Sequence, residues 1–308
     1  MLLRYIGKRL LQTLIVIFVV TIIAFSLVRL APGNPATLML VDTATEEQIR
    51  EMEIYLGLDK PLLVQYWKYI SGLLQGDFGT SFSYGVPVIN LIGERIGYTM
   101  KLTACITLFA VLLCVPLGII AGSNRGKLSD FCAMLFALVG QSMSPVWLAV
   151  LLVYVFSVLL GWLPAVGSEG LAAFILPAIT LGYPMSAEIT RVGRSGMIDS
   201  LGEDYIVATY AKGVKKSVVN WKYAFRNAVC PIITLVALSA SGHLAGSIVV
   251  EAIFALPGIG QLMNRAIGVR DYPIVQTLLV LMAVIFALMN LLVDIINSFV
   301  DPRISLED

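Results

Sequence analysis

A polar stretch that begins at Glu203 carries the side chains best suited to contact with another macromolecule, because it combines charges of both signs with small residues. Glu203, Asp204 and Lys212 can form ion pairs across an interface. Ala208 and Ala211 leave room for the groove of a second protein to approach closely. The alternative interpretation is a solvated basic face that lies at the lipid headgroups.

The local structure of this stretch, which we call the 203–231 loop, is predicted to be a bent pair of short helices. Asp204 lies near the start of the first helix and Lys212 near its end, as the helix dipole favours. Ser217 can cap the second helix. The loop is therefore expected to be a rigid lever.

A second candidate site lies within an apolar segment at 228–250. Gly242 and Gly246 form a small-xxx-small pattern with Ser239 alongside and His243 between them. This stripe is expected to meet protein or water, and packing within the chain and contact with a second subunit both explain it. An ionisable residue inside a membrane indicates a function, although a satisfied structural histidine explains His243 equally well.

The remaining candidate motifs exclude several kinds of chemistry. The run at 122–128 has three residues rather than four between its glycines and Leu128 where a phosphate-binding loop needs Ser or Thr, so it is a turn and not an ATP site. No Ser-His-Asp arrangement, C-x-x-C spacing or metal-ligand cluster is visible, so we expect no enzyme activity, metal or cofactor. A net charge of +1 argues against a nucleic-acid partner.

Composition identifies an integral membrane protein. The 308 residues are 58% hydrophobic and only 13% charged, with a mean hydropathy of +0.88. A helical span needs about 20 apolar residues, and six segments qualify. They are 10–30, 102–121, 131–160, 171–190, 228–250 and 274–299. We therefore predict an all-α protein with six transmembrane helices.

Prolines and charged residues within the predicted spans indicate how some of these spans are shaped and packed. Pro145 predicts that the third span is tilted or kinked, and Pro177 and Pro184 place the fourth inside the bundle or along a pathway. Glu188 and Arg191 are interpreted as an i,i+3 ion pair. Asp294 in the sixth span is expected to act in helix packing.

Basic residues in short loops place both termini in the cytoplasm. The loop at 161–170 has no Lys or Arg, whereas seven occupy the region 191–227. This topology divides the chain into a cytoplasmic N-terminus with the first span (1–30), an extracytoplasmic insertion (31–101) and a five-helix core (102–308). Thr45 and Gln48 predict a capping box that starts one helix of the insertion.

The second helix of the insertion is expected after Pro61. Leu62, Leu63, Tyr66 and Ile70 would share one of its faces. Gly57 is expected to stop the helix that precedes it. The insertion is therefore predicted to be folded.

The 203–231 loop resembles the cytoplasmic loop by which permease subunits of ABC importers dock on their ATPase, in the form found in the dipeptide, oligopeptide and nickel importer family. The chain departs from the family pattern at Val207 and Tyr210, where Arg is usual, and at Tyr223, where His is frequent. Further landmarks follow in order along the chain, including 31–35, 56–61, 76–81, 161–164, 251–254, 257–260, 270–273 and 301–303. The matching loop residues are Glu203, Asp204, Tyr205, Ala211, Lys212, Gly213, Arg226, Asn227, Ala228 and Pro231.

The resemblance implies a six-span, type I importer permease in the bacterial inner membrane. Its partners would be a second homologous permease, two ATP-binding cassette subunits that hydrolyse ATP, an extracytoplasmic solute-binding protein and the lipid bilayer. The stripe of Ser239, Gly242, His243 and Gly246 would face the translocation pathway. Short peptides are the favoured substrate, nickel or metal chelates the alternative, and a self-sufficient ion-coupled transporter is the alternative from a different class.

Overall fold

The computed structural model describes residues 2–30, 36–37, 45–167 and 169–300, and in this part of the chain the elements are helices apart from one isolated bridge between Thr80 and Pro87. Five helices are long and apolar enough to cross a membrane. They are α1 (Leu2–Leu30), α5 (Val88–Ser123), α8 (Ala172–Leu201), α11 (Phe225–Leu244) and α14 (Tyr272–Val300). The landmark runs at 31–35 and 301–303 lie outside the described residues.

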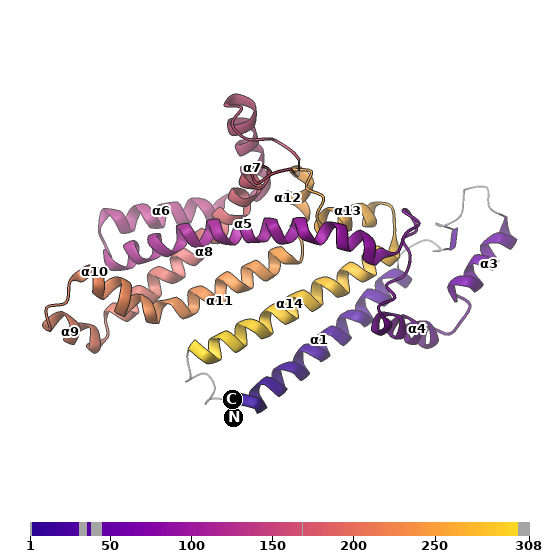
Figure 1. Ribbon diagram of the computed structural model, residues 1–308, viewed down its shortest axis with the longest axis horizontal. Coiled ribbons are helices and arrows are strands. Elements are labelled where there is room, and N and C mark those ends of the chain that lie inside the picture. Colours follow the sequence, from indigo (N-terminus) through magenta and orange to yellow (C-terminus); the bar gives the residue numbers. More distant parts are fainter. Residues whose placement is uncertain (1, 31–35, 38–44, 168, 301–308) are drawn as a thin grey trace.

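The sixth candidate span is a bent pair of helices. Helix α6 (Leu128–Ser142) ends just before Pro145, where α7 (Pro145–Leu152) begins and continues into the π-helix η1 (Val153–Leu159). The two halves meet at 102°, so the expected kink at Pro145 is confirmed and amounts to nearly a right angle. Figure 1 shows α7 rising away from the bundle.

Two span boundaries differ from the prediction. Helix α5 begins at Val88 rather than near residue 102, because polar residues such as Glu94 stay on its exposed side while Val88, Leu91 and Ile92 pack into an apolar cluster with residues of 259–278. Helix α11 ends at Leu244 rather than at 250, and the separate helix α12 (Ile248–Ile253) follows. Gly246 has a φ of +105° between them, a conformation that ends an α-helix.

The bundle is organised around α5 and α8, which form its most extensive helix pair. Helices α6 and α11 pack on α8, while α14 packs on both α11 and α1. In Figure 1 the short helices α9 and α10 lie at the left end of the bundle, the end toward which α14 runs and from which α1 starts. We call this the loop end, and the opposite end, with α3, α4, α12 and α13, the insertion end. Buried side chains such as Ile106, Leu176 and Phe254 form the core.

Two helices of the insertion follow their sequence signals. Helix α3 (Glu46–Leu56) starts with the predicted capping box, in which Gln48 N–H donates to Thr45 Oγ1 and Thr45 N–H donates to Gln48 Oε1. It stops at Gly57 in the left-handed conformation, as expected. Helix α4 (Leu62–Gln75) also forms, between Pro61 and Gly76.

The predicted packing face of α4 is only partly right. Tyr66 packs against α1, where its ring lies 5.3 Å from that of Phe25. Leu62 and Leu63 are exposed instead, because the face turned toward α1 is centred on Tyr66 and Tyr69. The apolar outer face of α4 thus contacts nothing in the described chain that would bury it.

A buried carboxylate organises the insertion end. Glu251 of α12 is 1% exposed, and its oxygens accept hydrogen bonds from Thr99 Oγ1 and from the backbone N–H of Gln261, each at 2.9 Å. Thr99 Oγ1 in turn accepts from Ile259 N–H at the start of α13 (Ile259–Gly268). The carboxylate therefore supplies the negative charge that a helix N-terminus favours. Burial raises the pKa of Glu251, and the hydrogen bonds from Gln261 and Thr99 oppose that rise.

Glu251→Ala is expected to lower the melting temperature of the detergent-solubilised protein. The change leaves two buried donors, on Gln261 and Thr99, without their acceptor, at about 1–3 kcal/mol each. The matched control is Glu51→Ala on the exposed surface of α3, which should melt like the wild type. An unchanged melting temperature for Glu251→Ala would show that the carboxylate does not hold the insertion end together.

Candidate functional site: the 203–231 loop and the adjoining cavity

The 203–231 loop begins with one short helix at the loop end. Helix α9 (Asp204–Ala211) follows Glu203 as its N-cap residue, has Asp204 in its first turn and ends at Lys212, as predicted. Gly213 then has a φ of +78°, and its N–H donates to the carbonyl of Tyr210 at 2.9 Å. A left-handed residue at this point turns the chain sharply after α9.

The rest of the loop differs from the predicted second short helix. Helix α10 (Lys216–Val218) runs into the π-helix η2 (Val219–Ala224) and then directly into α11. Lys215 is its N-cap residue and Ser217 lies inside it, so the predicted cap is wrong. No helix-breaking residue occurs between 216 and 230, and the chain therefore continues as one helical rod into the span.

Helix α9 is attached to the bundle by a single apolar side chain of its own. Ile206 is fully buried in a cluster with Ile119 of α5, Met197 of α8 and Val219 of η2. These contacts connect α9 to three helices of the bundle at once. Any displacement of α9 is therefore transmitted to them, because closely packed interiors yield little. Ile206 was not singled out from the sequence because Val207 beside it is aliphatic as well, and only the fold shows that Ile206 is buried while Val207 is exposed.

The predicted contact residues all lie on the outer surface of this loop. A hydrogen bond from Asn227 Nδ2 to Tyr205 Oη, 2.8 Å long, fixes α9 against the start of α11. Burial, followed by the charge of Glu203, raises the pKa of Tyr205, which keeps its hydroxyl neutral. The exposed set is Glu203, Asp204, Tyr205, Ala208, Ala211, Lys212, Gly213, Arg226 and Asn227.

Apolar and aromatic residues extend this surface beyond the predicted set. Val207, Tyr210 and Trp221 are exposed on α9 and η2. Exposed aromatic residues of this kind are typical of the energetic centre of a protein interface. Val207 and Tyr210 are two of the positions at which the sequence departs from the family pattern, and they expose apolar and aromatic surface where Arg is usual.

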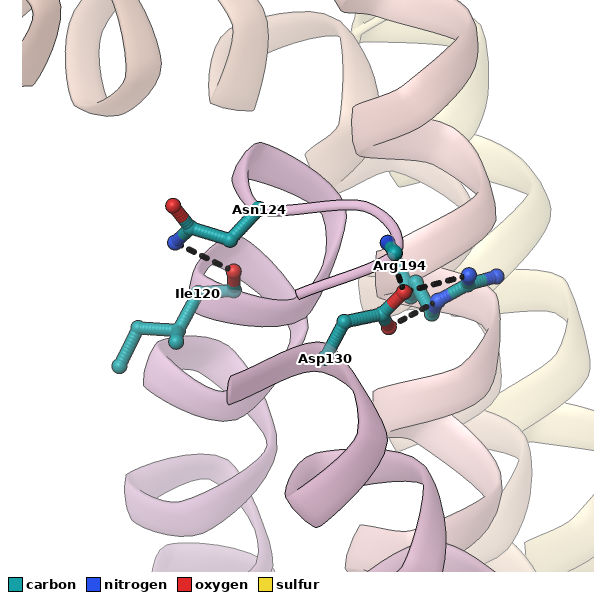
Figure 2. Close-up of polar contacts among 5 residues, drawn as sticks. Ile120, Asn124, Asp130 and Arg194 are labelled. Atoms are coloured by element: carbon teal, nitrogen blue, oxygen red, sulfur yellow. Dashed lines mark hydrogen bonds and ion pairs between the residues drawn. The ribbon is translucent and has the colours of Figure 1, made fainter. Parts of the chain in front are cut away.

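An ion pair holds the bundle together just before the loop. Arg194 of α8 donates from Nε to Asp130 Oδ1 at 2.6 Å and from Nη2 to Asp130 Oδ2 at 2.9 Å (Figure 2). The N–H of Gly126 also donates to Oδ2. This bidentate arrangement joins the turn between α5 and α6 to α8, and such fork geometry is both strong and directional. The sequence analysis missed the pair, because its members are 64 residues apart.

Glycines bring the backbones of α5, α8 and α11 into contact near this ion pair. A Cβ at Gly118 would lie 3.4 Å from the Cα of Gly193, and one at Gly196 would lie 3.3 Å from the Cα of Ala228. A Cβ at Gly122 would overlap the Met197 side chain. Small residues with this spacing allow close helix packing in membranes.

A cavity of about 350 Å³ is lined by residues of α6, α7, α8 and α11. It brings together three residues of the predicted stripe, Ser239, Gly242 and His243, with Glu188 of α8 and Gln141 of α6. The cavity thus combines an acidic side chain, an imidazole, an amide and a hydroxyl with apolar residues such as Leu181 and Met185.

Gly246, the fourth member of the stripe, does not belong to this cavity. It follows the end of α11, and a Cβ on it would lie 3.1 Å from the Cα of Gly260 in α13. The helical spacing that grouped it with Gly242 ends at Leu244. Its inclusion in one helical stripe was therefore wrong.

Two further predictions about charged residues have different outcomes. The Glu188–Arg191 ion pair is wrong, because the Nη1 of Arg191 donates to Gln141 Oε1 while Glu188 lines the cavity. Asp294 does act between helices, since its Oδ2 lies 3.2 Å from Arg9 Nη1 and links α14 to α1.

Known proteins similar to this chain share its whole length. Residues 114–306 match the family described as binding-protein-dependent transport system inner membrane component, and residues 2–103 match the N-terminal region of the same kind of protein. The glutathione transport system permease protein GsiC of Salmonella paratyphi A is 40% identical over 302 residues, which is 98% of this chain and 99% of that protein. GsiC of Escherichia coli K12 is 39% identical over the same shares of both chains.

A solved structure shares the fold. The methionine ABC transporter MetNI, in inward-facing conformations, contains a chain that superposes with a TM-score of 0.57 and 19% identity. The match covers 69% of this chain and 97% of that chain. Its coverage corresponds to a common helical core to which the present chain adds further residues.

The ion pair is expected to stabilise the loop end cooperatively. Asp130→Asn and Arg194→Gln should each lower the melting temperature, since removing one partner of a buried pair costs about 3–5 kcal/mol and the partial exposure of Arg194 reduces that figure. The double variant should lose much less than the sum of the two single losses. Asp199→Asn, at an exposed position of α8, is the control. Strictly additive losses would show that the two side chains do not interact.

Proposed function

Since the chain belongs to the family of binding-protein-dependent transport inner-membrane permeases, we propose that it forms half of a peptide pathway and is driven by separate ATPases through the 203–231 loop. The family assignment makes it a multi-pass inner-membrane component of a multi-subunit ABC importer and not itself the ATP-hydrolysing enzyme. It also decides against the self-sufficient ion-coupled transporter.

The partners that complete this importer are a second homologous permease, two ATP-binding cassette subunits and an extracytoplasmic solute-binding protein. The loop end would face the cytoplasm, with both termini on that side, as the distribution of Lys and Arg suggests. The folded insertion would then lie at the mouth of the pathway, where the solute-binding protein docks.

The coupling proposal rests on the difference in burial between the two faces of α9. All nine predicted contact residues are exposed, whereas Ile206 on the opposite face is buried among α5, α8 and η2. A surface that is free on one side and firmly packed on the other can bind a moving partner and transmit its displacement. When ATP draws the cassette subunits together, α9 would move with them, and α8 and α11 would follow.

The cavity beside α8 and α11 is the candidate segment of the pathway. Motion transmitted through Ile206 reaches the two helices that supply most of its lining, so opening and closing of the cavity would be linked to the ATPase cycle. Gln141 is also held by Arg191 at its edge. A change in the angle between α8 and α11 would alter the cavity directly.

The favoured substrate is a short peptide such as glutathione. The relatives at about 40% identity are glutathione permeases, and this supports the peptide over the nickel or metal-chelate alternative. A short peptide carries ammonium, carboxylate and amide groups. The carboxylate of Glu188, the imidazole of His243 and the amide of Gln141 provide complementary partners for all three.

Ala208→Trp in the loop is expected to reduce transport about tenfold or more while the protein still inserts into the membrane. An indole at a closely approached alanine overfills the docking slot, and a loss of about 1.4 kcal/mol in docking is already tenfold. The measurements are ATP-dependent glutathione uptake into proteoliposomes and co-purification of the cassette subunit. Gly213→Pro should act similarly, because proline cannot adopt a φ of +78°.

The control for this experiment is Ala172→Trp, at an exposed alanine near the opposite end of α8. It should insert normally and retain both cassette binding and transport. Wild-type uptake by Ala208→Trp and Gly213→Pro would remove the loop from the coupling role.

Cysteines at Gly242, His243 and Glu188 are expected to react with a membrane-impermeant thiol reagent in at least one state of the ATP cycle. The background lacks the four native cysteines, and Ala240→Cys, on a buried position of the same helix, is the control that should stay unlabelled. S-methylglutathione, which has no free thiol to consume the reagent, should slow the labelling. Labelling of these positions only by lipid-soluble reagents would show that the cavity faces hydrocarbon.

A further inference from the structure

We propose that helix α4 of the insertion lies in the lipid leaflet at the insertion end, where Lys60 and Lys68 bind phosphate groups of phospholipids. The partner of this surface is thus a lipid and not a protein. The inference does not depend on the transported solute.

Helix α4 contacts α1 at a depth well inside the apolar span of α1. Tyr66 Oη lies 2.9 Å from Thr21 Oγ1, and the Tyr66 ring also contacts Phe18 and Phe25 in edge-on geometry. The apolar span of α1 extends over Arg9–Leu27, so Thr21 lies about 9 Å inside its end at 1.5 Å per residue. Tyr66 therefore reaches a level where the neighbouring surface of α1 is in hydrocarbon.

The outer face of α4 is apolar and exposed. Leu63 and Leu74 are each 84% exposed and Trp67 is 74% exposed. The adjacent face of α1 is similarly apolar and exposed at Leu14, Ile15 and Ile22. A patch of this composition is costly in water but favourable in a bilayer. The faces of α1 and α4 form one apolar surface because the two helices touch through Tyr66.

The opposite side of α4 carries the positive charge of two lysines. A cavity of about 280 Å³ lies between α4 and the start of α14, and both Lys60 and Lys68 line it together with Gln276 and Thr277. Neither ammonium lies within 4 Å of a carboxylate among the described residues. Asp77, which also lines the cavity, accepts the N–H of Gly79 instead.

These three features match a phospholipid at the membrane interface. A lysine near the membrane interface extends its ammonium group toward the headgroups while its methylene stem remains in apolar surroundings. Trp is enriched at the same level. A water-soluble protein is a poor candidate for the outer face of α4, because that face is continuous with the lipid-facing side of α1.

The depth of α4 can be tested in the assembled transporter with its partner subunits, reconstituted into vesicles of phosphatidylethanolamine and phosphatidylglycerol. Nitroxide labels are attached to Leu63→Cys and Trp67→Cys in a cysteine-free background, with Leu14→Cys on α1 as the lipid-facing control and Glu51→Cys on α3 as the water-facing control. We expect the α4 labels to collide readily with oxygen and rarely with a water-soluble nickel chelate, as at Leu14.

Two other outcomes would overturn the proposal. If the α4 labels meet the nickel chelate as readily as Glu51→Cys does, the helix lies in water. If they are shielded from both oxygen and nickel chelate, a protein covers the face.

The lysines are tested separately by the preference of the transporter for spin-labelled phosphatidylglycerol over spin-labelled phosphatidylcholine. Lys60→Gln with Lys68→Gln should lower this preference by about fivefold for each lysine, whereas the two Lys→Arg changes should preserve it. Arg50→Gln on α3 is the control for a basic residue placed elsewhere in the insertion. An unchanged preference in the double Gln variant would show that these lysines do not bind lipid phosphate.

Discussion

Close backbone contact among α5, α8 and α11 is the constraint on which the rest of this structure depends. In a bilayer, lipid surrounds the helices with an environment as apolar as their own side chains, so packing must supply much of the association. Gly118 against Gly193 and Gly196 against Ala228 provide it at the loop end. Backbones this close leave little room for relative movement, so we expect the three helices to move as one body there.

This rigid body allows a displacement of the 203–231 loop to be passed on to the bundle. Helix α9 touches the bundle through Ile206, and the residues that surround Ile206 belong to the same three-helix contact region. The ion pair between Asp130 and Arg194 adds the turn after α5 to that region. A surface that docks on a moving partner would otherwise bend locally, and little of the displacement would reach the cavity around His243.

Features encoded by neighbouring residues were predictable from the sequence, whereas features that require distant partners were not. The capping box at Thr45, the stop at Gly57 and the kink at Pro145 depend on local backbone preferences, and all three are confirmed. The small-xxx-small pattern was assigned to Gly242 and Gly246, but Gly242 has no close neighbour, whereas Gly118 and Gly122, with the same spacing, both pack against α8. Spacing alone could not reveal that α11 ends between Gly242 and Gly246.

The contacts of the buried carboxylates could not be predicted, because their partners are distant in the sequence. The same contacts indicate where the protein resists distortion. Asp130 pairs with Arg194 at the loop end, while Glu251 holds the N-terminus of α13 at the insertion end. These polar contacts lie toward the two ends, and the middle of the bundle is held mainly by apolar packing. The ion pair and the hydrogen bonds of Glu251 fix the two ends, so the ends should keep their form while the helices between them change angle. The cavity lies in that middle zone, and the break in the chain after Leu244 gives α11 freedom to tilt relative to α12.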